Sequence, residues 1–327
     1  MYNIIKIKKE ADKLKKTSIG GQAVIEGVMM RGKTIYAMAV RNPEGGITLE
    51  EQNCTGLSKK YKLFTLPIFR GMAAFVDSLV TGTKIMMRSA EIAGEAIMEE
   101  EEPSKFEKWV MDKFGDKMND IVIYISVFLS IIMSVGLFFM LPVWLGGFFK
   151  TVIPTWGLGV VEGLIRISIF LIYIFAISKM KEIQRVFQYH GAEHKTINCF
   201  EKELPLTVEN VKTCTRLHKR CGTSFLLIVM IISMVVLFFV QTDNIALRLI
   251  SRIVLVPFIA GISYEVIKWA GSSDNKLVAM VSYPGLCLQK ITTSEPDGSQ
   301  IETAIAAMKK VLEVEGDDSQ KIEEIRK

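Results

Sequence analysis

The stretch HKRCGTSFLLIVMIISMVVLFFV, residues 218–240, decides the fold class of this 327-residue chain. From residue 223 to residue 240 it contains no charged side chain. A helix needs about 20 predominantly apolar residues to cross about 30 Å of hydrocarbon. With its flanks the stretch has that length, so it predicts a transmembrane helix that begins beside a histidine and a cysteine.

Three further runs are apolar and uncharged, at residues 121–141, 167–177 and 253–264. The alternative to a membrane helix is a helix buried in a protein core. The membrane interpretation is weakest for the last run, because its helix would begin with Arg248 and Arg252. Together the four runs and their flanks predict transmembrane helices at 120–142, 159–180, 222–241 and 246–269.

Lys and Arg are distributed unevenly between the predicted connections. The connection 179–222 carries nine of them, whereas 143–158 contains only Lys150 and 242–245 contains none. Positively charged loops stay in the cytoplasm, which predicts a multi-pass protein of the cytoplasmic (inner) membrane with cytoplasmic amino and carboxyl termini. The net charge of +5 follows from this bias, so the lipid bilayer is an expected partner and nucleic acid is not.

The amino-terminal segment 1–16 contains six lysines. It lacks the apolar run of about 7–15 residues that a signal peptide requires. We therefore expect a basic arm that rests on anionic lipid.

The remaining sequence predicts both strands and helices. Alternating and β-branched residues predict strands, and the Asn, Pro and Gly residues at 42–46 predict a hairpin turn. Helical spacing predicts an amphipathic helix at 67–96 on the membrane surface and a last helix capped by Asp297 or Ser299. The predicted strands are 22–29, 34–40 and 47–50, the predicted extended segment is 277–293, and the last helix is 300–314.

These elements predict a polytopic α-helical membrane protein with about four transmembrane helices. A cytoplasmic α+β body would be formed by the N-terminal strands, the 179–222 loop and the C-terminal segment. The predicted domains are a cytoplasmic hairpin and amphipathic-helix region at 1–118, a membrane domain at 119–271 and a cytoplasmic segment at 272–327.

All three histidines of the chain lie within a stretch of 29 residues, and two cysteines lie within or directly after it. They are His190, His194 and His218, with Cys214 and Cys221. Disulfides are not expected in a reducing cytoplasm, which leaves thiolate ligands or buried apolar thiols. Imidazole beside thiolate is the ligand set that zinc favours, so we expect Zn²⁺ or another divalent transition metal. The alternative is solvated histidines among lysines, with the cysteines in a core.

The sequence HGAEH at 190–194 has the H-x-x-E-H spacing. No proline interrupts residues 155–204, so the second membrane helix is expected to continue to about Phe200, with His190 and His194 on one face. In H-x-x-E-H enzymes two histidines hold zinc and the glutamate is the general base. The pattern therefore predicts a catalytic Glu193.

Cys214, His218 and Cys221 are spaced four and three apart, as on one stripe of a second helix. We expect His218 to be the third metal ligand, with Cys221 or Cys214 as the fourth. Three protein ligands would leave the open position that a catalytic zinc needs, whereas four would make the site structural.

Other polar side chains are weaker candidates. Gln22 and Glu26 lie between the glycines at the two ends of the predicted first strand. We expect them to support the site or to bind substrate. The alternative for Glu26 is a charge on an edge strand. Glu265 lies in the fourth predicted membrane helix, where an ionisable residue is expected to be functional. Its depth argues against metal ligation, so we expect it to pair with Lys268 or Arg166, or to face a polar cavity.

Five motifs between residues 20 and 305 carry a family resemblance. They are GGQAVIEGVMMRG (20–32), YHGAEHKTINCFE (189–201), HKRCGTSF (218–225), GISYEVIKWAG (261–271) and PGLCLQKITTSEPDGSQIETAI (284–305). In these motifs the chain resembles the YqhQ family of bacterial membrane proteins, a domain of unknown function often labelled a metal-dependent enzyme. The resemblance implies that the following residues belong with the histidine cluster: Gln22, Glu26, Arg31, Glu265, Gln289 and Thr292.

We therefore expect a cytosol-facing, zinc-type, metal-dependent hydrolase of a membrane-associated or cytosolic substrate. The alternative is a non-catalytic membrane scaffold or transport-related protein with a structural zinc. A third, weaker hypothesis is an ion or solute path through Arg166 and Glu265. The expected roles are metal ligation by His190, His194, His218 and Cys221, and general-base catalysis by Glu193.

Overall fold

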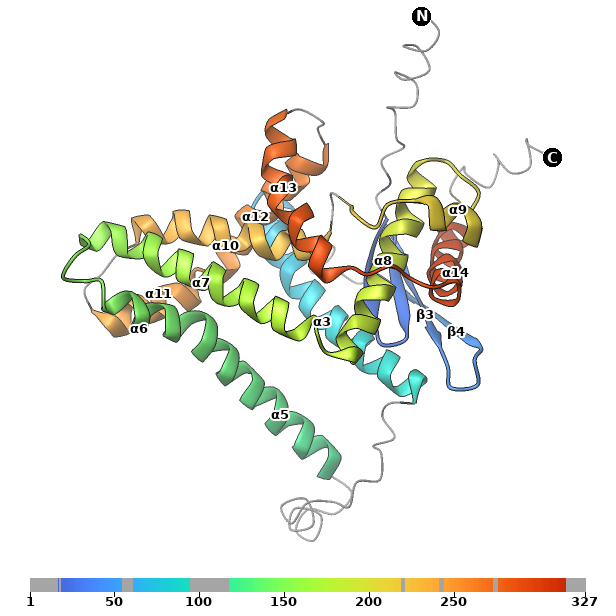
Figure 1. The fold of residues 1–327 in the computed structure, drawn as a ribbon, viewed down its shortest axis with the longest axis horizontal. Coiled ribbons are helices and arrows are strands. Elements are labelled where there is room, and N and C mark those ends of the chain that lie inside the picture. Colours follow the sequence, from blue (N-terminus) through green and yellow to red (C-terminus); the bar gives the residue numbers. More distant parts are fainter. Residues whose placement is uncertain are drawn as a thin grey trace, which may run out of the picture. The chain divides into compact units, whose positions relative to one another are not determined.

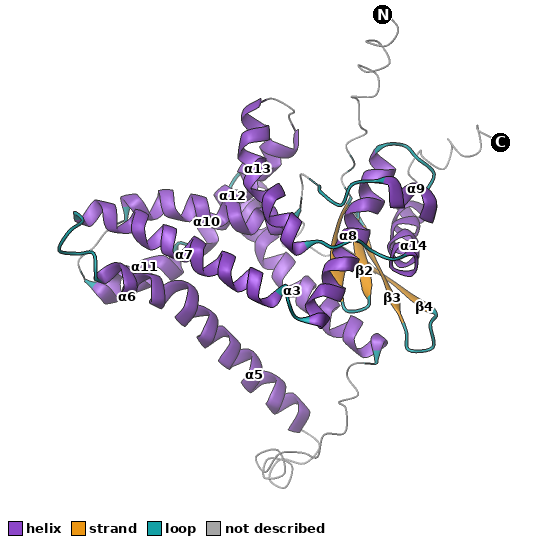
Figure 2. Cartoon of the chain, viewed as in Figure 1, coloured by secondary structure: helices purple, strands orange, loops and turns teal. Residues whose placement is uncertain are grey.

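A computed structural model shows a mostly helical protein with one small antiparallel sheet near its amino terminus (Figure 2). The structure describes residues 17, 19–54, 61–94, 118–218, 221–240, 244–272 and 276–315. The predicted basic arm at 1–16 lies outside these residues.

The chain divides into two compact units. The first contains residues 1–95, 174–227 and 260–327, and the second contains residues 96–173 and 228–259. The first unit is therefore built from three separate stretches of sequence. The domain boundaries predicted at 118 and 271 remain predictions.

Four antiparallel strands in sequence order form the sheet of the first unit. They are β1 (Gly20–Val24), β2 (Gly27–Arg31), β3 (Ile35–Arg41) and β4 (Ile47–Asn53). The single strand predicted at 22–29 is wrong, because the chain reverses there: Val24 pairs with Gly27. The turn uses Glu26 at a φ of 51°, and the next residue is a glycine whose added Cβ would strike the backbone of β3.

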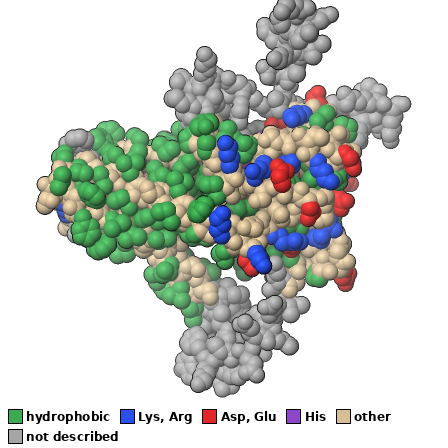
Figure 3. Space-filling view, viewed as in Figure 1, with side chains coloured by type: hydrophobic (Ala, Val, Ile, Leu, Met, Phe, Trp, Pro, Cys, Tyr) green, Lys and Arg blue, Asp and Glu red, His purple; other side chains and the backbone are tan. Residues whose placement is uncertain are grey.

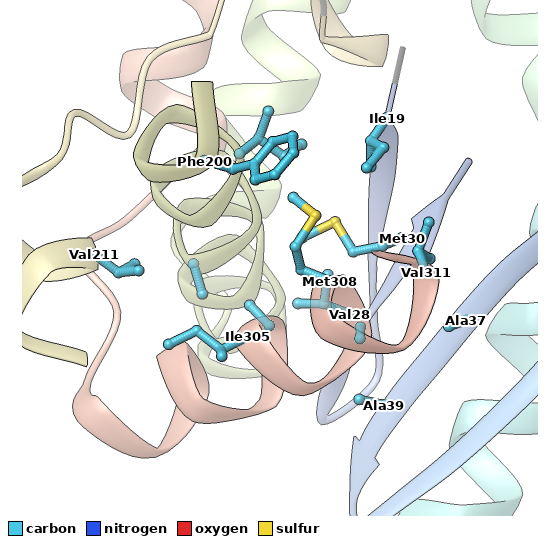
Figure 4. Packing of buried hydrophobic residues seen from close by; sticks show 14 of the residues in the cluster. Ile19, Val28, Met30, Ala37, Ala39, Phe200, Val211, Ile305, Met308 and Val311 are labelled. Carbon is cyan, nitrogen blue, oxygen red and sulfur yellow. The ribbon is translucent and has the colours of Figure 1, made fainter. Parts of the chain in front are cut away.

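Two helices cover one face of this sheet (Figure 1). They are α8 (Lys181–Glu201) and α14 (Gly298–Glu315). Figure 4 shows the core between them, where Met30 of β2 meets Met308 of α14 and Phe200 of α8 lies above both. Burial of these apolar side chains is the main force that holds α8 on the sheet.

The opposite face of the sheet packs on α3 (Phe69–Ala93), through Met29 and Met38 against Ile85. The prediction of a helix at 67–96 is thereby confirmed. Neighbouring residues of one strand, such as Met29 and Met30, point to opposite faces. The central strands β2 and β3 are covered on both faces, so successive residues of these two strands are buried and apolar. The edge strand β4 keeps an alternating and more exposed pattern.

The predicted continuous helix from 159 to about 200 is wrong. The chain forms α7 (Thr155–Ile177) and, separately, α8, because Met180 is extended with a ψ of 134°. The carbonyl of Ser178 accepts a hydrogen bond from the side chain of Gln184 at 3.1 Å. A side chain thus satisfies a carbonyl at the end of α7, and α8 can leave in its own direction.

The predicted extended segment at 277–293 is also wrong, because it forms α13 (Lys276–Thr292) with Pro284 inside the helix. The last helix is confirmed, and its cap is Asp297. The Asp297 carboxylate accepts a hydrogen bond from the backbone of Gln300 at 2.9 Å, and the Gln300 side chain accepts one from the backbone of Asp297 at 2.9 Å. This is a reciprocal capping box.

Three helical stretches among the described residues are long and apolar enough to cross a membrane, at Ile125–Gly147, Gly157–Ile177 and Leu249–Trp269. A shorter apolar helix covers Phe225–Phe239. On the face drawn in Figure 3, hydrophobic side chains cover the helices of the second unit. The elements of these stretches are α5 (Met118–Val135), the π-helical turn η3 (Gly136–Met140), α6 (Leu141–Gly147), α7, α10 (Gly222–Phe239), α11 (Ile245–Val254) and α12 (Val256–Ser272).

Candidate metal centre

Two histidines of α8 and one cysteine just before α10 converge in the first unit. One ligand atom from each of His190, His194 and Cys221 lies within 4.8 Å of the others. The three residues are buried, at 9%, 1% and 7% exposure. The two histidines stand one helical turn apart, with ring centroids separated by 4.4 Å, as the i, i+4 spacing predicts.

Backbone carbonyls orient both imidazoles. Nδ1 of His190 lies 2.8 Å from the carbonyl oxygen of Thr292, and Nδ1 of His194 lies 2.6 Å from that of Arg216. A carbonyl only accepts, so each Nδ1 carries a proton and donates it. In the neutral ring Nε2 therefore presents its lone pair, and burial lowers the pKa of His194 so that this ring stays neutral.

The two Nε2 atoms have different surroundings. Nε2 of His190 lies 3.2 Å from Sγ of Cys221. Nε2 of His194 is buried, and no side chain or backbone group of the described residues forms a hydrogen bond with it. The Cys221 sulfur also accepts a hydrogen bond from the backbone N–H of Thr223 at 3.4 Å.

Residues 214–218 and Cys221 are not helical, so the predicted stripe of Cys214, His218 and Cys221 on a second helix is wrong. The helix α9 (Val208–Thr213) ends before this segment. In a helix the backbone carbonyls of this segment would accept hydrogen bonds from its own N–H groups. Here they accept hydrogen bonds from side chains of α8 instead. Asn198 donates to the carbonyls of Thr215 and Leu217 at 2.7 and 3.1 Å.

His218 lies close to the cluster but faces another group. Its ring centroid is 5.8 Å from that of His194, while its Nε2 lies 3.4 Å from a carboxylate oxygen of Glu201. Gln289 of α13 holds its backbone: the amide N–H of His218 donates to Oε1 at 2.8 Å, and its carbonyl accepts from Nε2 at 2.7 Å. His218 is thus fixed beside the two ligand histidines and outside their group.

Cys214 lies away from the three converging ligand atoms. Its thiol donates to the carbonyl of Asn210 at 3.6 Å. It also neighbours the Cys199 thiol, whose pKa rises to about 12, because of burial first and of Cys214 second. Both thiols are buried and behave as apolar core groups.

Glu193 projects from α8 toward β1. A Cβ added at Gly21 would lie 2.8 Å from the Glu193 carboxyl carbon, so the glycine makes room for this side chain. Burial raises the pKa of Glu193 to about 7, although His190 and a hydrogen bond from the backbone of Ala23 lower it. One carboxyl oxygen, Oε2, is buried and has no hydrogen-bond partner within the described part of the chain.

Gln22 and Glu26 have hydrogen-bond partners outside the cluster. Gln22 donates to the carbonyl of Gly82 at 3.4 Å. Glu26 forms an ion pair with Arg185 and accepts a hydrogen bond from the Tyr189 hydroxyl at 3.2 Å. Arg185 and Tyr189 lie on α8 just before His190, so Glu26 fixes the turn of α8 that precedes the ligands.

Glu265 has a partner that the sequence did not indicate. Its carboxylate binds Arg70 of α3, with 2.6 Å between Oε1 and Nε. The predicted pairing with Lys268 or Arg166 is therefore wrong. Arg166 instead donates to the carbonyl of Phe138 at 2.9 Å. Arg70 and Glu265 are 195 positions apart, and no local sequence pattern could have paired them.

Gly191 was missed by the sequence analysis. A Cβ there would strike the carbonyl of Ser294, and the backbone N–H of Ser294 donates to the carbonyl of Phe187 at 2.8 Å. This contact brings the end of α13 against α8 and places the Thr292 carbonyl at His190. The available signal was a glycine inside a helix, between two histidines, where it costs about 1 kcal/mol relative to alanine.

Comparisons with known proteins agree on one family. The family described as "Protein of unknown function (DUF1385)" matches residues 66–314. A protein of Bacillus subtilis (strain 168) named "Uncharacterized protein YqhQ" is 38% identical over 305 residues, which cover 90% of this chain and 92% of the relative. No solved structure matches. The predicted resemblance is confirmed.

Proposed function

We propose that this chain, which belongs to the DUF1385 family, is a membrane-associated, metal-dependent hydrolase. Its metal would be held by His190, His194 and Cys221. The observation that carries the proposal is the pair of imidazoles whose Nδ1 atoms donate to backbone carbonyls. Metal-binding histidines use this second hydrogen bond to fix the ring and its tautomer.

The donor set fits zinc. Tetrahedral zinc with bonds of about 2.0 Å to nitrogen and 2.3 Å to sulfur separates its ligand atoms by about 3.3–3.6 Å. The 3.2 Å between His190 Nε2 and Cys221 Sγ is close to that spacing. The buried Nε2 of His194 lacks a partner, and a buried acceptor of this kind is costly unless something binds it.

Three protein ligands leave one position open, as in catalytic zinc sites. Zinc supplies a Lewis acid that polarises a substrate carbonyl or phosphoryl group and activates water. Glu193 supplies a buried carboxyl whose pKa of about 7 suits proton transfer near neutral pH. Its unpartnered Oε2 is the atom that we assign to take the proton.

Glu193→Gln tests this assignment. The purified protein is screened against ester, amide and phosphoester substrates, and its bound metal is measured in parallel. We expect activity to fall by a factor of about 10² or more while metal content is unchanged. The matched control is Glu182→Gln, an exposed glutamate in the first turn of α8, which keeps full activity. Undiminished activity in Glu193→Gln, or loss of its metal, contradicts the assigned role.

A second candidate, a structural zinc in a non-catalytic scaffold or transport-related protein, is favoured by the burial of all three ligands. In that case the metal contributes folding energy. Chelation would then lower the unfolding temperature and no substrate would be turned over. A hydrolase with an open position instead loses activity on chelation at temperatures where the protein remains folded.

We also place the chain in the cytoplasmic membrane. The three long apolar helices support insertion. We propose the shorter apolar helix Phe225–Phe239, together with its flanks, as a fourth span. The nine Lys and Arg residues of 179–222, against Lys150 alone in 143–158, support cytoplasmic termini and a metal centre that faces the cytosol. Its substrate is then cytosolic or membrane-associated.

A further inference from the structure

The second unit contains a buried group of charged side chains, which is separate from the metal centre. Glu162 and Arg166 lie on α7, and Arg252 lies on α11. Their exposed fractions are 1%, 6% and 1%. All three lie within the stretches Gly157–Ile177 and Leu249–Trp269, which are apolar enough to cross a membrane. Ionisable residues in such stretches are costly to bury and are by default functional.

The charges of these three side chains do not balance. Nη2 of Arg252 forms an ion pair with the Glu162 carboxylate. Arg166 adds a second guanidinium, which donates to the carbonyl of Phe138 at 2.9 Å and to the hydroxyl of Ser233 at 3.3 Å. Those two acceptors are neutral. Because a guanidinium does not deprotonate in proteins, the group of three retains one excess positive charge.

Both guanidinium groups also carry unused donors. Nη2 of Arg166 and both Nε and Nη1 of Arg252 are buried, and none of them has a hydrogen-bond partner among the residues that the structure describes. A buried donor left unsatisfied destabilises the fold, and more so when it is charged. Arg166 interacts electrostatically with both Arg252 and Glu162, so the excess charge and the unused N–H groups lie in one buried region. Both features favour binding of a negatively charged acceptor.

The geometry points to a binding site for a small inorganic anion of the halide class, such as chloride, formed by Arg166 and Arg252. Tight packing favours a single-atom ion over phosphate or an organic carboxylate. A Cβ at Gly146 would lie 2.8 Å from Cγ of Glu162, and the Phe139 ring lies 5.4 Å from the Arg166 guanidinium carbon. The ion would neutralise the excess charge and accept from donors that have no other partner.

Radiolabelled chloride tests the site directly. The full chain is purified in detergent, and binding is measured at constant ionic strength with gluconate as the replacing anion. We expect one saturable class of site, displaced by bromide and unaffected by phosphate or acetate. Absence of saturable binding overturns the proposal, and displacement by phosphate or acetate overturns the halide class.

Variants then assign the binding to these residues. Arg166→Gln keeps the Arg252–Glu162 pair and makes the group neutral, so we expect chloride affinity to fall at least about tenfold. Glu162→Gln removes the competing carboxylate, so affinity should rise. Arg88→Gln, at an exposed arginine of α3, is the control and should bind as the wild type does. Wild-type affinity in a folded Arg166→Gln overturns the proposal. If that variant does not fold, unchanged or weaker affinity in Glu162→Gln overturns it.

Discussion

Nε2 of His190 lies 3.2 Å from Sγ of Cys221, although the two residues are 31 positions apart. The histidine comes from the middle of α8, and the cysteine from a non-helical segment that ends where α10 begins. Side chains of α8 and α13 hold that segment by its carbonyls and amides. The candidate metal centre therefore depends on long-range contacts more than on the local H-x-x-E-H spacing.

His218→Gln separates the two possible third ligands. The ring of His218 faces Glu201, whereas Cys221 lies with the two ligand histidines. We expect this variant to keep its bound metal and to lose about 1–3 kcal/mol of stability, because Glu201 loses a buried partner. Elemental analysis and a thermal melt provide both readouts. Metal loss as large as in His194→Ala would make His218 a ligand after all.

Gly191→Ala should weaken both the fold and the metal site. The added Cβ would strike the Ser294 carbonyl, and overpacking of this kind costs about 1–3 kcal/mol. Movement of Ser294 would also displace the neighbouring Thr292 carbonyl, which orients His190. We expect a lower unfolding temperature and weaker metal affinity in a competition assay with a chromogenic chelator.

The control for this change is Gly222→Ala. Gly222 begins α10 directly after Cys221, and a Cβ there would meet nothing within 4 Å. It should therefore match the wild type in both measurements. Equal behaviour of the Gly191 and Gly222 variants would show that the contact with Ser294 does not hold the site.

Local sequence patterns predicted those helices that are determined by residues close together in the sequence. The capping box of α14 depends on Asp297 and Gln300, three residues apart, and the apolar periodicity of α3 is equally visible in the sequence. The break between α7 and α8 was not predictable, because no proline or glycine marks it. It depends on a side-chain bond from Gln184 to the carbonyl of Ser178.

The sequence predicted which residue types converge at the candidate site. It did not predict the backbone conformation of the segment that precedes Cys221. The pairing of His190 with His194 follows from helical spacing. The non-helical course of residues 214–218 depends on Gln289, which is 71 positions from His218. The spacing of Cys214, His218 and Cys221 fits a helix equally well, so only tertiary contacts decide between a helix and a loop.

The carboxylate of Glu315 should make stability depend on pH. Burial alone raises the pKa of Glu315, but its hydrogen bonds from the backbone and hydroxyl of Thr34, at 2.6 and 2.9 Å, bring the pKa below its ordinary value. A lowered folded-state pKa adds stability above the unfolded-state pKa, and this stability is lost as the pH falls through the folded-state pKa.

Glu315→Gln should consequently lower the unfolding temperature at pH 7, and the difference from wild type should shrink below about pH 4. The matched control is Glu313→Gln, an exposed glutamate of the same helix that pairs with Lys310 at 3.3 Å. It should have a smaller effect at pH 7. A constant difference between Glu315→Gln and wild type across this pH range would contradict the assignment.

The most direct test of the metal centre compares two cysteines by elemental analysis of the detergent-purified protein. Cys221 lies among the ligand atoms, whereas Cys214 is equally buried but hydrogen-bonds Asn210. We predict about one zinc per chain in the wild type and in Cys214→Ser, and a large loss of zinc in Cys221→Ser. Absence of metal from the wild type, or equal zinc in the two variants, would contradict the account.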